Sequence, residues 1–338
     1  MSTIRDIARL SGYSIGTVSR VINNRADVSD EAREKINKVI AETGFQPNSN
    51  AKLLKQTTSS AITILVKGTK NFFLETILED IQELLRNHNE AVSVVFLDEL
   101  SNEAEAAMQI CAERKPKGLI FLGGNLDYRK NTLGASETPA VLVTGNAENL
   151  GLNNLSSFST DDYSAAREAV ECLIDAGHTK IGIVGGSETA DHGNVGTSRL
   201  EGAVDMLREK NIAFDMNRNF EPGRFSAEDG YCAAKKLLAK ADDITAIFAL
   251  SDTIAVGVMR AAKDLGKNIP EDLSIIGFDG IEYTRFSIPR LATVCQSASL
   301  LASKSVEDLL LRINYKRRPV HEMIPYEICE GESIKKIH

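Results

Sequence analysis

The chain has 338 residues, of which 43% are hydrophobic and 25% are charged. These fractions are typical of soluble globular proteins, so they exclude a disordered, fibrous or collagen-like chain. Because domains usually hold roughly 100 to 200 residues, the length predicts two or three folded units.

The sequence predicts neither an export signal, a membrane span nor a disulfide framework. Charged residues interrupt the first ten positions, and no stretch approaches the roughly 18 apolar residues of a membrane span. The five cysteines are odd in number, contain no Cys-x-x-Cys pair and lie more than thirty positions apart. This pattern argues against disulfides and a cysteine zinc site, and favours small buried residues in a reducing, cytoplasmic compartment. The cysteines are Cys111, Cys172, Cys232, Cys295 and Cys329.

The total charge of −8 is unevenly distributed along the chain. Residues 1–56 carry nine basic and six acidic side chains, a net charge of +3, so the remainder has a net charge of −11. A small basic head on an acidic body is typical of a polyanion-binding module attached to another domain. Segments of this length and charge are also common in other proteins, so the charge alone does not establish a polyanion-binding module.

The basic head is predicted to form three short helices around a small core. Apolar residues repeat at helical spacing in each helix, and Gly12 allows a short turn between the first two, as in a helix-turn-helix. The first helix is predicted to end near Ser11 and the third at Gly44. Each begins after a side chain that can cap its N-terminus, namely Thr3, Ser14 and Ser29.

Four stretches of the head carry a longer pattern, which reads TIRDIA at 3–8, SIGTVSRVIN at 14–23, VS at 28–29 and FQPN at 45–48. In this order they resemble the start of LacI/GalR (lactose-repressor) family transcriptional regulators. The resemblance implies that the second helix enters the DNA major groove while the first crosses the phosphates.

The resemblance places Ile15, Gly16 and Arg20 at the family's base-reading positions. Arg20 can form a bidentate pair with guanine, which contributes roughly 1 to 3 kcal/mol of discrimination, whereas Ile15 offers only apolar contact with a thymine methyl. The alternative is that Arg20 pairs only with a phosphate or a carboxylate. The resemblance gives five further DNA-binding positions, which are Thr3, Ser14, Thr17, Ser19 and Asn23. Of these, Ser14, Thr17 and Ser19 are expected to cap helices and to contact phosphates.

Residues 48–56 have a helix-forming composition but fall short of the roughly 12 to 15 residues at which isolated helices become marginally stable. In the resembled family this segment is a hinge helix that folds on operator DNA and inserts a leucine between base pairs of the minor groove. Leu54 matches that leucine, Ala51 matches the small packing residue, and Asn48 begins the segment. The alternative is an ordinary linker.

These patterns divide the chain into a DNA-binding domain (1–47), a hinge helix and linker (48–60) and a core (61–338).

The core is predicted to be α/β, with two doubly wound subdomains, because short β-rich apolar runs alternate with helical segments. The predicted strands are 61–66, 91–97, 118–122, 140–143, 180–184, 246–250 and 273–278. The predicted helices are 74–85, 103–113, 164–176, 198–209, 227–240, 253–265 and 300–312.

The core sequence contains no motif for catalysis or for a nucleotide cofactor. The glycine pairs at 123–124 and 185–186 extend to neither a dinucleotide-binding fingerprint nor a P-loop, and no G-x-S-x-G is present. The five histidines fall at no metal spacing, and His178 is predicted to be structural at a helix end. We therefore predict no cofactor, no metal and no enzymatic activity.

The family resemblance continues through the core. It implies a periplasmic-binding-protein-like sensor of two subdomains, between which the chain crosses near residues 160, 291 and 322. The N-subdomain would hold about 61–160 and 292–322, and the C-subdomain about 161–291 and 323–338. Landmarks of the resemblance are the motifs at 72–73, 161–162, 176–181, 199–202, 225–226, 251–252, 270–272 and 277–279.

The resemblance also assigns an effector cleft between the subdomains. Arg199 and Asp279 can bond sugar hydroxyls, and Phe225 can stack on an apolar ring face. The alternatives are that the aromatic residues only pack in the core and that Arg199 and Asp279 pair with each other. The full set is Phe72 and Phe73 from the N-subdomain with Arg199, Phe225, Ser251 and Asp279 from the C-subdomain.

Three positions depart from the family pattern. Thr144 stands where sugar-binding members often have an aspartate, and Ser251 stands where some have an asparagine. Gly193 replaces the arginine of purine-sensing members, so a sugar is favoured over a purine.

These features predict a homodimeric repressor of carbohydrate-utilisation genes that binds a palindromic operator and responds to a sugar or sugar derivative. The tail after residue 330 lacks leucine heptads, so no tetramerising helix is expected. The alternative is a cytoplasmic sugar-binding receptor, or a sugar-processing α/β enzyme, with an incidental basic head.

Overall fold

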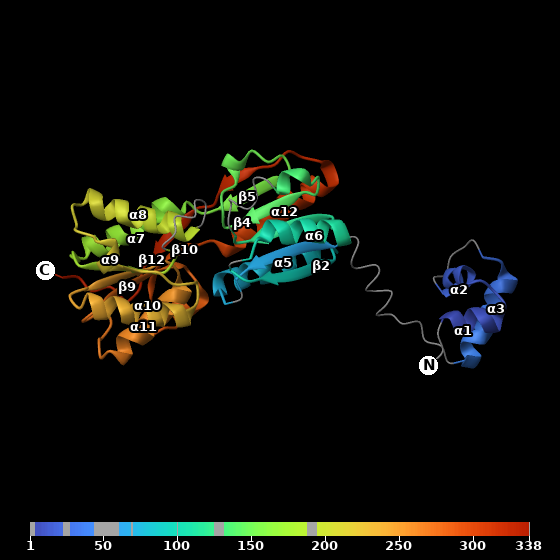
Figure 1. Ribbon diagram of the computed structural model, residues 1–338, viewed down its shortest axis with the longest axis horizontal. Helices are drawn as coiled ribbons and strands as arrows, with labels where there is room; N and C mark the ends of the chain where they lie inside the picture. The colour runs from blue at the N-terminus through green and yellow to red at the C-terminus, as the bar shows by residue number, and fades with distance from the viewer. Residues whose placement is uncertain are drawn as a thin grey trace. The chain divides into compact units, whose positions relative to one another are not determined.

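The computed structural model describes residues 4–22, 28–43, 61–68, 70–99, 101–124, 132–187 and 195–337 (Figure 1). The chain divides into two compact units, Met1–Thr57 and Thr58–His338, so the division falls inside the predicted linker. Among the described residues, no helix has the length and apolar character needed to cross a membrane.

The first unit contains the three predicted helices, α1 (Ile4–Ser11), α2 (Ile15–Ile22) and α3 (Asp30–Thr43). Ser14 Oγ accepts a hydrogen bond from the Thr17 N–H at 3.1 Å, and Ser29 Oγ accepts one from the Ala32 N–H at 3.4 Å. These bonds satisfy N–H groups that have no partner within the helix, which is why α2 and α3 begin where they do. The predicted cap Thr3 and the predicted helix end Gly44 lie outside the described residues.

One small apolar core joins the three helices. Its buried members come from all three, as the helical periodicity predicted, and they are Ile7, Ala8, Val18, Val21 and Ile36. Tyr13, Val28, Val39 and Ile40 pack around this core.

The N-subdomain is built on a parallel sheet with strand order β11-β5-β4-β3-β1-β2. Its strands are β1 (Ile62–Lys67), β2 (Val92–Leu97), β3 (Gly118–Leu122), β4 (Ala140–Val143), β5 (Leu155–Ser159) and β11 (His321–Met323). Its helices are α5 (Phe72–Asn87), α6 (Glu103–Arg114) and α12 (Ala298–Tyr315), with short 3-10 turns η2 (Leu133–Ala135) and η3 (Glu148–Leu150).

The C-subdomain is built on a second sheet with strand order β12-β10-β9-β8-β6-β7, in which only β12 runs antiparallel to its neighbour. Its strands are β6 (Ile181–Val184), β7 (Phe220–Glu221), β8 (Ala246–Ala249), β9 (Ser274–Asp279), β10 (Ala292–Gln296) and β12 (Tyr326–Cys329). Its helices are α7 (Asp162–Asp175), α8 (Val195–Glu209), α9 (Met216–Asn219), α10 (Ala227–Lys240) and α11 (Asp252–Asp264), with the 3-10 turn η4 (Glu282–Arg285).

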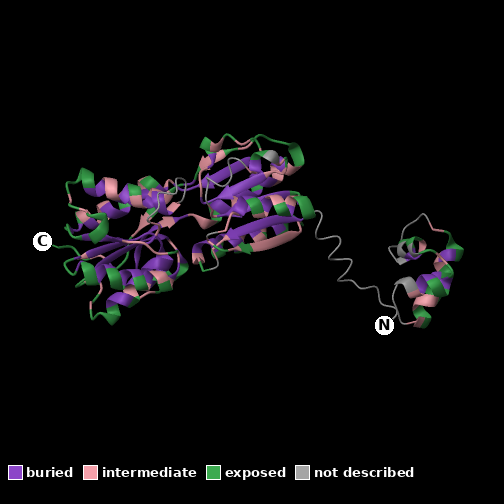
Figure 2. Cartoon of the chain, in the orientation of Figure 1, coloured by how far each residue is buried: buried purple, intermediate pink, exposed green. Residues whose placement is uncertain are grey.

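Helices cover both faces of each sheet, so the central strands are buried (Figure 2). In the N-subdomain, α5 and α12 pack on one face and α6 on the other. In the C-subdomain, α7 and α8 cover one face while α10 and α11 cover the other. This doubly wound arrangement explains why the strands read as continuous apolar runs in the sequence.

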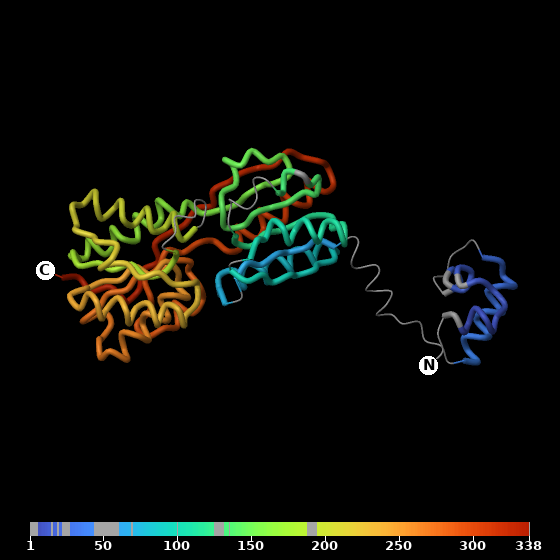
Figure 3. Tube along the Cα trace, viewed as in Figure 1, coloured from blue at the N-terminus to red at the C-terminus, as the bar shows by residue number. Residues whose placement is uncertain are grey.

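The chain crosses three times between the two subdomains (Figure 3). The first crossing follows β5 at Thr160. The second follows β10 at Ser297 rather than near residue 291, because Ala292–Gln296 pairs with β9 in the C-subdomain sheet. The third lies between β11 and β12, at Ile324 and Pro325, slightly beyond the predicted residue 322. The predicted subdomain boundaries at 291 and 322 are corrected accordingly.

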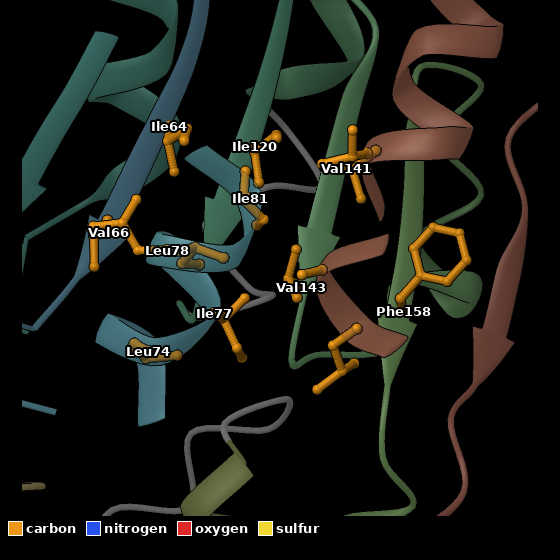
Figure 4. Packing of buried hydrophobic residues seen from close by; sticks show 14 of the residues in the cluster. Ile64, Val66, Leu74, Ile77, Leu78, Ile81, Ile120, Val141, Val143 and Phe158 are labelled. Carbon is orange, nitrogen blue, oxygen red and sulfur yellow. The ribbon is translucent and has the colours of Figure 1, made fainter. Parts of the chain in front are cut away.

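The N-subdomain core illustrates how strand alternation sorts side chains (Figure 4). Ile64 and Val66 of β1 face α5, where they meet residues such as Ile77 and Ile81. Leu65, between them in sequence, lies in the separate cluster under α6. Successive side chains of a strand point to opposite faces, so one short strand contributes to both apolar layers.

The prediction about the cysteines is wrong on two counts. Cys295 on β10 and Cys329 on β12 form a disulfide, because the antiparallel pairing of these strands brings together residues 34 positions apart. None of the other three is fully buried, and Cys232 is exposed. The sequence spacing contained no sign of the strand pairing that decides the bond.

His178 occupies a structural position, as predicted. Its side chain is buried and lies after the end of α7. Nδ1 lies 2.9 Å from Thr245 Oγ1, and Nε2 lies 2.9 Å from Ser274 Oγ and 3.2 Å from the Lys335 carbonyl. Burial lowers the pKa of His178, which favours the neutral imidazole.

Candidate functional site

The predicted effector residues lie beyond the carboxyl ends of parallel strands. Asp279 ends β9, Ser251 follows β8, Phe225 follows β7, and Phe72 follows β1 at the start of α5. Arg199 lies on α8, the helix that follows β6. Open parallel sheets bind ligands at this end of their strands, so the topology agrees with a binding site here.

Arg199 is the centre of a buried polar cluster. Its side chain is only 3% exposed. Nε donates to Asp162 Oδ1 at 2.7 Å, and Nη1 donates to Asp279 Oδ1 at 3.1 Å and to the Leu250 carbonyl at 2.7 Å. The guanidinium carbon lies 3.7 Å from the centroid of the Phe278 ring. A buried cation requires such pairing, since an isolated charge away from water is strongly unfavourable.

Asp279 is held in an unusual conformation at the end of β9. Its φ of 122° lies in a region that non-glycine residues rarely adopt, and Gly280 follows with a φ of 76°. Asp279 Oδ1 also accepts a hydrogen bond from Gln296 Nε2 at 2.9 Å. Burial raises the pKa of Asp279 to about 6, although the Arg199 charge opposes this increase.

Asp252 stabilises the turn after Asp279. Its Oδ2 accepts hydrogen bonds from the N–H groups of Gly280 at 2.6 Å and Ile281 at 2.9 Å, and its Oδ1 accepts one from Thr293 Oγ1 at 2.6 Å. Burial, and next the negative charge of Asp279, raise the pKa of Asp252 well above its usual value. Ile281 in turn is buried among N-subdomain side chains, so this turn contacts both subdomains.

The polar cluster extends to the segments that connect the subdomains. Thr160, at the first crossing, donates from Oγ1 to Gln296 Oε1 at 2.6 Å, and Gln296 directly precedes the second crossing. The Gln296 amide, beside the second crossing, therefore joins Thr160 at the first crossing to Asp279. A change at the Arg199–Asp279 pair can reach the interdomain connections through this one side chain.

The structure brings together Arg199 and Asp279 and pairs them with each other, which is the alternative to ligand binding that the sequence also allows. Phe72 is half-buried, with its ring centroid 5.2 Å from that of Tyr283 in the C-subdomain. Phe73 lies in the N-subdomain core. Phe225 is half-buried against the cluster under α10 and α11.

Ser251 has a structural role as a helix cap, and Thr144 lies in an unusual backbone conformation. Ser251 is buried, and its Oγ accepts a hydrogen bond from the Ile254 N–H at 3.1 Å, which caps α11. Thr144, where an aspartate was noted as missing, is buried with a positive φ of 76°. Gly193 lies outside the described residues.

Sequence reasoning did not assign roles to Asp162, Asp252 or Gln296. The pairs Asp161-Asp162 and Ser251-Asp252 stood out in the sequence, and the structure places each second aspartate in the buried cluster. Gln296 carried no signal, because only the pairing of β10 with β9 brings it beside Asp279.

The cluster is suited to binding rather than to bond cleavage. It combines a cation, carboxylates and an amide with nearby aromatic rings, which is the set of groups that orients hydroxyl-rich ligands in protein sites. Within the described ranges, no group of three or more histidine, cysteine or acidic side chains is arranged to hold a metal ion.

In the first unit, α2 and its capping residue Ser14 carry several of the candidate DNA-contacting residues. Gly16 and Arg20 are exposed, and Ser14 Oγ lies 2.9 Å from Thr17 Oγ1. Several predicted contacts cannot be placed: the side chains of Ile15 and Ser19, and the residues Thr3, Asn23, Asn48, Ala51 and Leu54, lie outside what the structure describes.

Comparisons with known proteins agree with this division of the chain. Residues 3–48 match the bacterial regulatory proteins of the lacI family, and residues 170–334 match the periplasmic binding protein-like domain. The chain is 35% identical to the HTH-type transcriptional regulator MalR of Clostridium butyricum, with 98% of each chain covered. It is 33% identical to the ribose operon repressor of Haemophilus influenzae, with 97% of each covered.

Among solved structures, a lac repressor dimer bound to operator and the anti-inducer ONPF has a TM-score of 0.70. That similarity extends over 99% of both chains at 24% identity, which establishes a shared fold. With a relative above 30% identity along nearly its whole length and a matching N-terminal family domain, this chain belongs to the lacI family of bacterial regulatory proteins.

Proposed function

We propose that the protein is a cytoplasmic, homodimeric repressor of carbohydrate-utilisation genes whose operator binding is controlled by a small sugar-like effector. The observation that carries the effector role is the buried Arg199–Asp279 pair, connected through Gln296 to the interdomain crossings. The relative named a ribose operon repressor supports the assignment to carbohydrate genes.

At the DNA, α2 would lie in the major groove with Arg20 reading a guanine, while Ser14, Thr17 and Ser19 would contact phosphates. Gly16 would allow close approach of the helix, and Ile15 would meet a thymine methyl. The hinge segment would fold on the operator, with Leu54 inserted between base pairs. Leu54→Ala should therefore weaken operator binding and leave effector binding unchanged.

At the effector site, Arg199 would donate to one sugar hydroxyl and Asp279 would accept from another, while Phe225 or Phe72 would stack on the ring. The ligand would therefore replace contacts that Arg199 and Asp279 now make with each other. Because Gln296 joins Asp279 to Thr160, this exchange would favour one arrangement of the subdomains over the other. Such coupling is typically about 1 to 3 kcal/mol and requires different ligand affinities for the two arrangements.

The DNA-binding role is tested by selecting sites from a randomised duplex pool with the full-length protein. We expect a palindromic consensus whose half-sites are separated by one helical turn, and affinity that falls steeply with salt. Arg20→Ala is the test variant. Salt-dependent binding without a consensus would contradict a repressor and leave a sugar-binding receptor as the better description.

The effector role is tested by thermal-shift titration against monosaccharides, disaccharides, sugar phosphates and nucleobases. A ligand at 100 times its Kd stabilises the folded state by roughly 2.7 kcal/mol, which such titrations detect. Asp279→Asn should abolish the shift. Asp264→Asn is the matched control, because Asp264 pairs with Arg260 on the exposed face of α11. A sugar response that survives Asp279→Asn would contradict the site.

A further inference from the structure

The two strands that carry the disulfide also border two of the interdomain crossings. Cys295 is followed by Gln296, the last residue of β10, after which the chain crosses at Ser297. Gln296 pairs across the sheet with Tyr326, the first residue of β12, where the chain returns after the third crossing. The Cys295–Cys329 bond therefore fixes the edge strand β12 to β10 beside both crossings.

The bond also lies against the turn that contains the candidate effector carboxylate. A Cβ placed on Gly280 would lie 2.8 Å from Cys295 Cα and 2.9 Å from Cys295 Sγ, so this cysteine packs directly on the turn after Asp279. The neighbouring Gln296 joins Asp279 to Thr160. A covalent change at Cys295 thus acts next to the Gln296 contacts that connect Asp279 to Thr160.

The geometry suits a bond that small reagents can open and close. The two Cα atoms are 5.8 Å apart, within the usual range for disulfides, so the strands need not move for the bond to form. Both cysteines are half-buried and β12 is the edge strand of its sheet, so the bond is not enclosed in the centre of the subdomain core. Disulfides in proteins that work among cytosolic thiols are usually transient and redox-sensing.

We propose that Cys295 and Cys329 form a reversible thiol–disulfide pair that makes the interdomain connections sensitive to oxidants of the peroxide class. One thiolate attacks hydrogen peroxide, which gives a sulfenic acid and releases hydroxide; the second thiol then displaces water and forms the S–S bond. Two thiols and one peroxide become one disulfide and two waters, and the sulfurs supply both electrons. A dithiol of the thioredoxin class reverses the reaction by exchange through a mixed disulfide.

Closing the bond restrains β12 and the adjacent crossings, and opening it frees them. The inference rests on the proposed function in one respect, because a regulator bound to chromosomal DNA works among reducing thiols. Its chemistry is nevertheless measurable without DNA or sugar, so failure of the redox test and failure of the proposed function are distinguishable.

The first experiment maps the bond in the full-length protein. The protein is reduced, treated with graded hydrogen peroxide, alkylated with N-ethylmaleimide and digested for peptide mass spectrometry. We expect a linked Cys295–Cys329 peptide pair while Cys111, Cys172 and Cys232 remain alkylated, and we expect thioredoxin with its reductase to reopen the bond in the folded protein. No linked pair, or a bond that thioredoxin leaves closed, overturns the proposal.

The second experiment measures the mechanical consequence by hydrogen exchange of residues 292–298 and 324–329. Reduction should accelerate exchange there by about tenfold or more, since local opening no longer works against a covalent link. Cys329→Ser and, independently, Cys295→Ser should exchange like the reduced protein under both conditions. Cys232→Ser, which removes an exposed thiol on α10, should respond like the wild type. Equal exchange in oxidised and reduced wild type overturns the proposed restraint.

Discussion

Arg199 lies in a charge arrangement that stabilises the fold only as long as each partner is present. Two carboxylates, Asp162 and Asp279, surround its buried guanidinium. Removing Asp162 leaves the guanidinium paired with Asp279, but the buried Nε–H of Arg199 loses its acceptor. The pair is therefore poised for ligand exchange, because hydroxyl groups can replace a carboxylate contact whereas an apolar side chain cannot.

Asp162→Ala should lower the free energy of unfolding by about 1.5 to 3 kcal/mol, the usual cost of losing a buried hydrogen bond to a charged group. Chemical denaturation followed by far-UV circular dichroism measures the change. Asp205→Ala removes a partner of the exposed Arg208 and should cost less than about 1 kcal/mol. Equal effects of the two variants would show that Asp162 does not compensate the buried charge.

The titration of Asp279 gives a pH dependence with a definite sign. Burial raises its pKa from 3.8 to about 6, so the folded protein binds this proton more tightly than the unfolded chain does. The stabilisation of the folded state that comes from protonation of Asp279 is fully present below pH 3.8 and is lost as the pH rises through about 6. Asp279→Asn removes this titration, so the melting temperature of wild type minus that of the variant should fall between pH 4 and pH 7.

Thermal unfolding at constant ionic strength measures this difference. A difference that stays constant across that pH range would mean that Asp279 does not titrate there. Effector affinity should change in the opposite sense, because the ionised carboxylate is the stronger acceptor of hydrogen bonds from sugar hydroxyls. Sugar binding should therefore weaken as the pH falls below about 6.

At the scale of elements, β9 connects the C-subdomain core to the candidate site. Its last residue is Asp279, and the preceding Phe278 is buried beneath the Arg199 guanidinium. α11 begins beside it, so that Asp252 accepts from the N–H groups of the turn that follows β9. The position of the Asp279 carboxylate thus depends on how closely β9 and α11 approach each other.

Gly277→Ala tests this close approach. A Cβ at Gly277 would lie 2.1 Å from Asp252 Oδ1 and 3.1 Å from Leu291 Cδ2, so α11 or Asp252 must shift. Overpacking of this kind costs about 1 to 3 kcal/mol and should also weaken sugar binding. Gly223→Ala is the control, because its nearest neighbour lies at 3.6 Å, an ordinary contact. Equal melting temperatures for the two variants would contradict the packing argument.

At the scale of the whole molecule, a palindromic operator requires two heads and hence a dimer. The described surface carries a group of large apolar side chains after β9, with Tyr283 59%, Phe286 73% and Ile288 95% exposed. Exposed apolar groups of this size usually mark an interface between proteins. We propose that this segment lies between the two subunits.

Ile288→Asp should therefore convert the dimer to a monomer and reduce operator affinity, because a monomer contacts one half-site. Sedimentation velocity and DNA titration measure the two effects. Val256→Asp is the comparison, since it places the same charge at an apolar side chain that is 37% exposed on α11. A dimer that persists in Ile288→Asp would remove this surface from consideration.

Much of the architecture was predictable from local pattern. The three helices of the head followed from capping serines and helical periodicity, and the long helices of the core were found within a few residues of their ends. Strands β5, β7, β11 and β12 were missed because none contains the continuous apolar run by which the short strands β4, β6 and β8 were predicted. β10 was not predicted as a strand, and its residues were assigned to the wrong subdomain, because the neighbouring strand decides to which sheet a strand belongs.

The sequence by itself determined the class of protein, since an ordered helix-turn-helix motif and an alternation of strands and helices are local properties of the chain. Only the tertiary structure decided how the site is arranged. Arg199 with Asp162 and Asp279, Gln296 between Asp279 and Thr160, and Cys295 bonded to Cys329 are contacts between residues 17 to 136 positions apart. Such contacts depend on strand order and on crossings between subdomains, and neither leaves a trace in the spacing of residues along the chain.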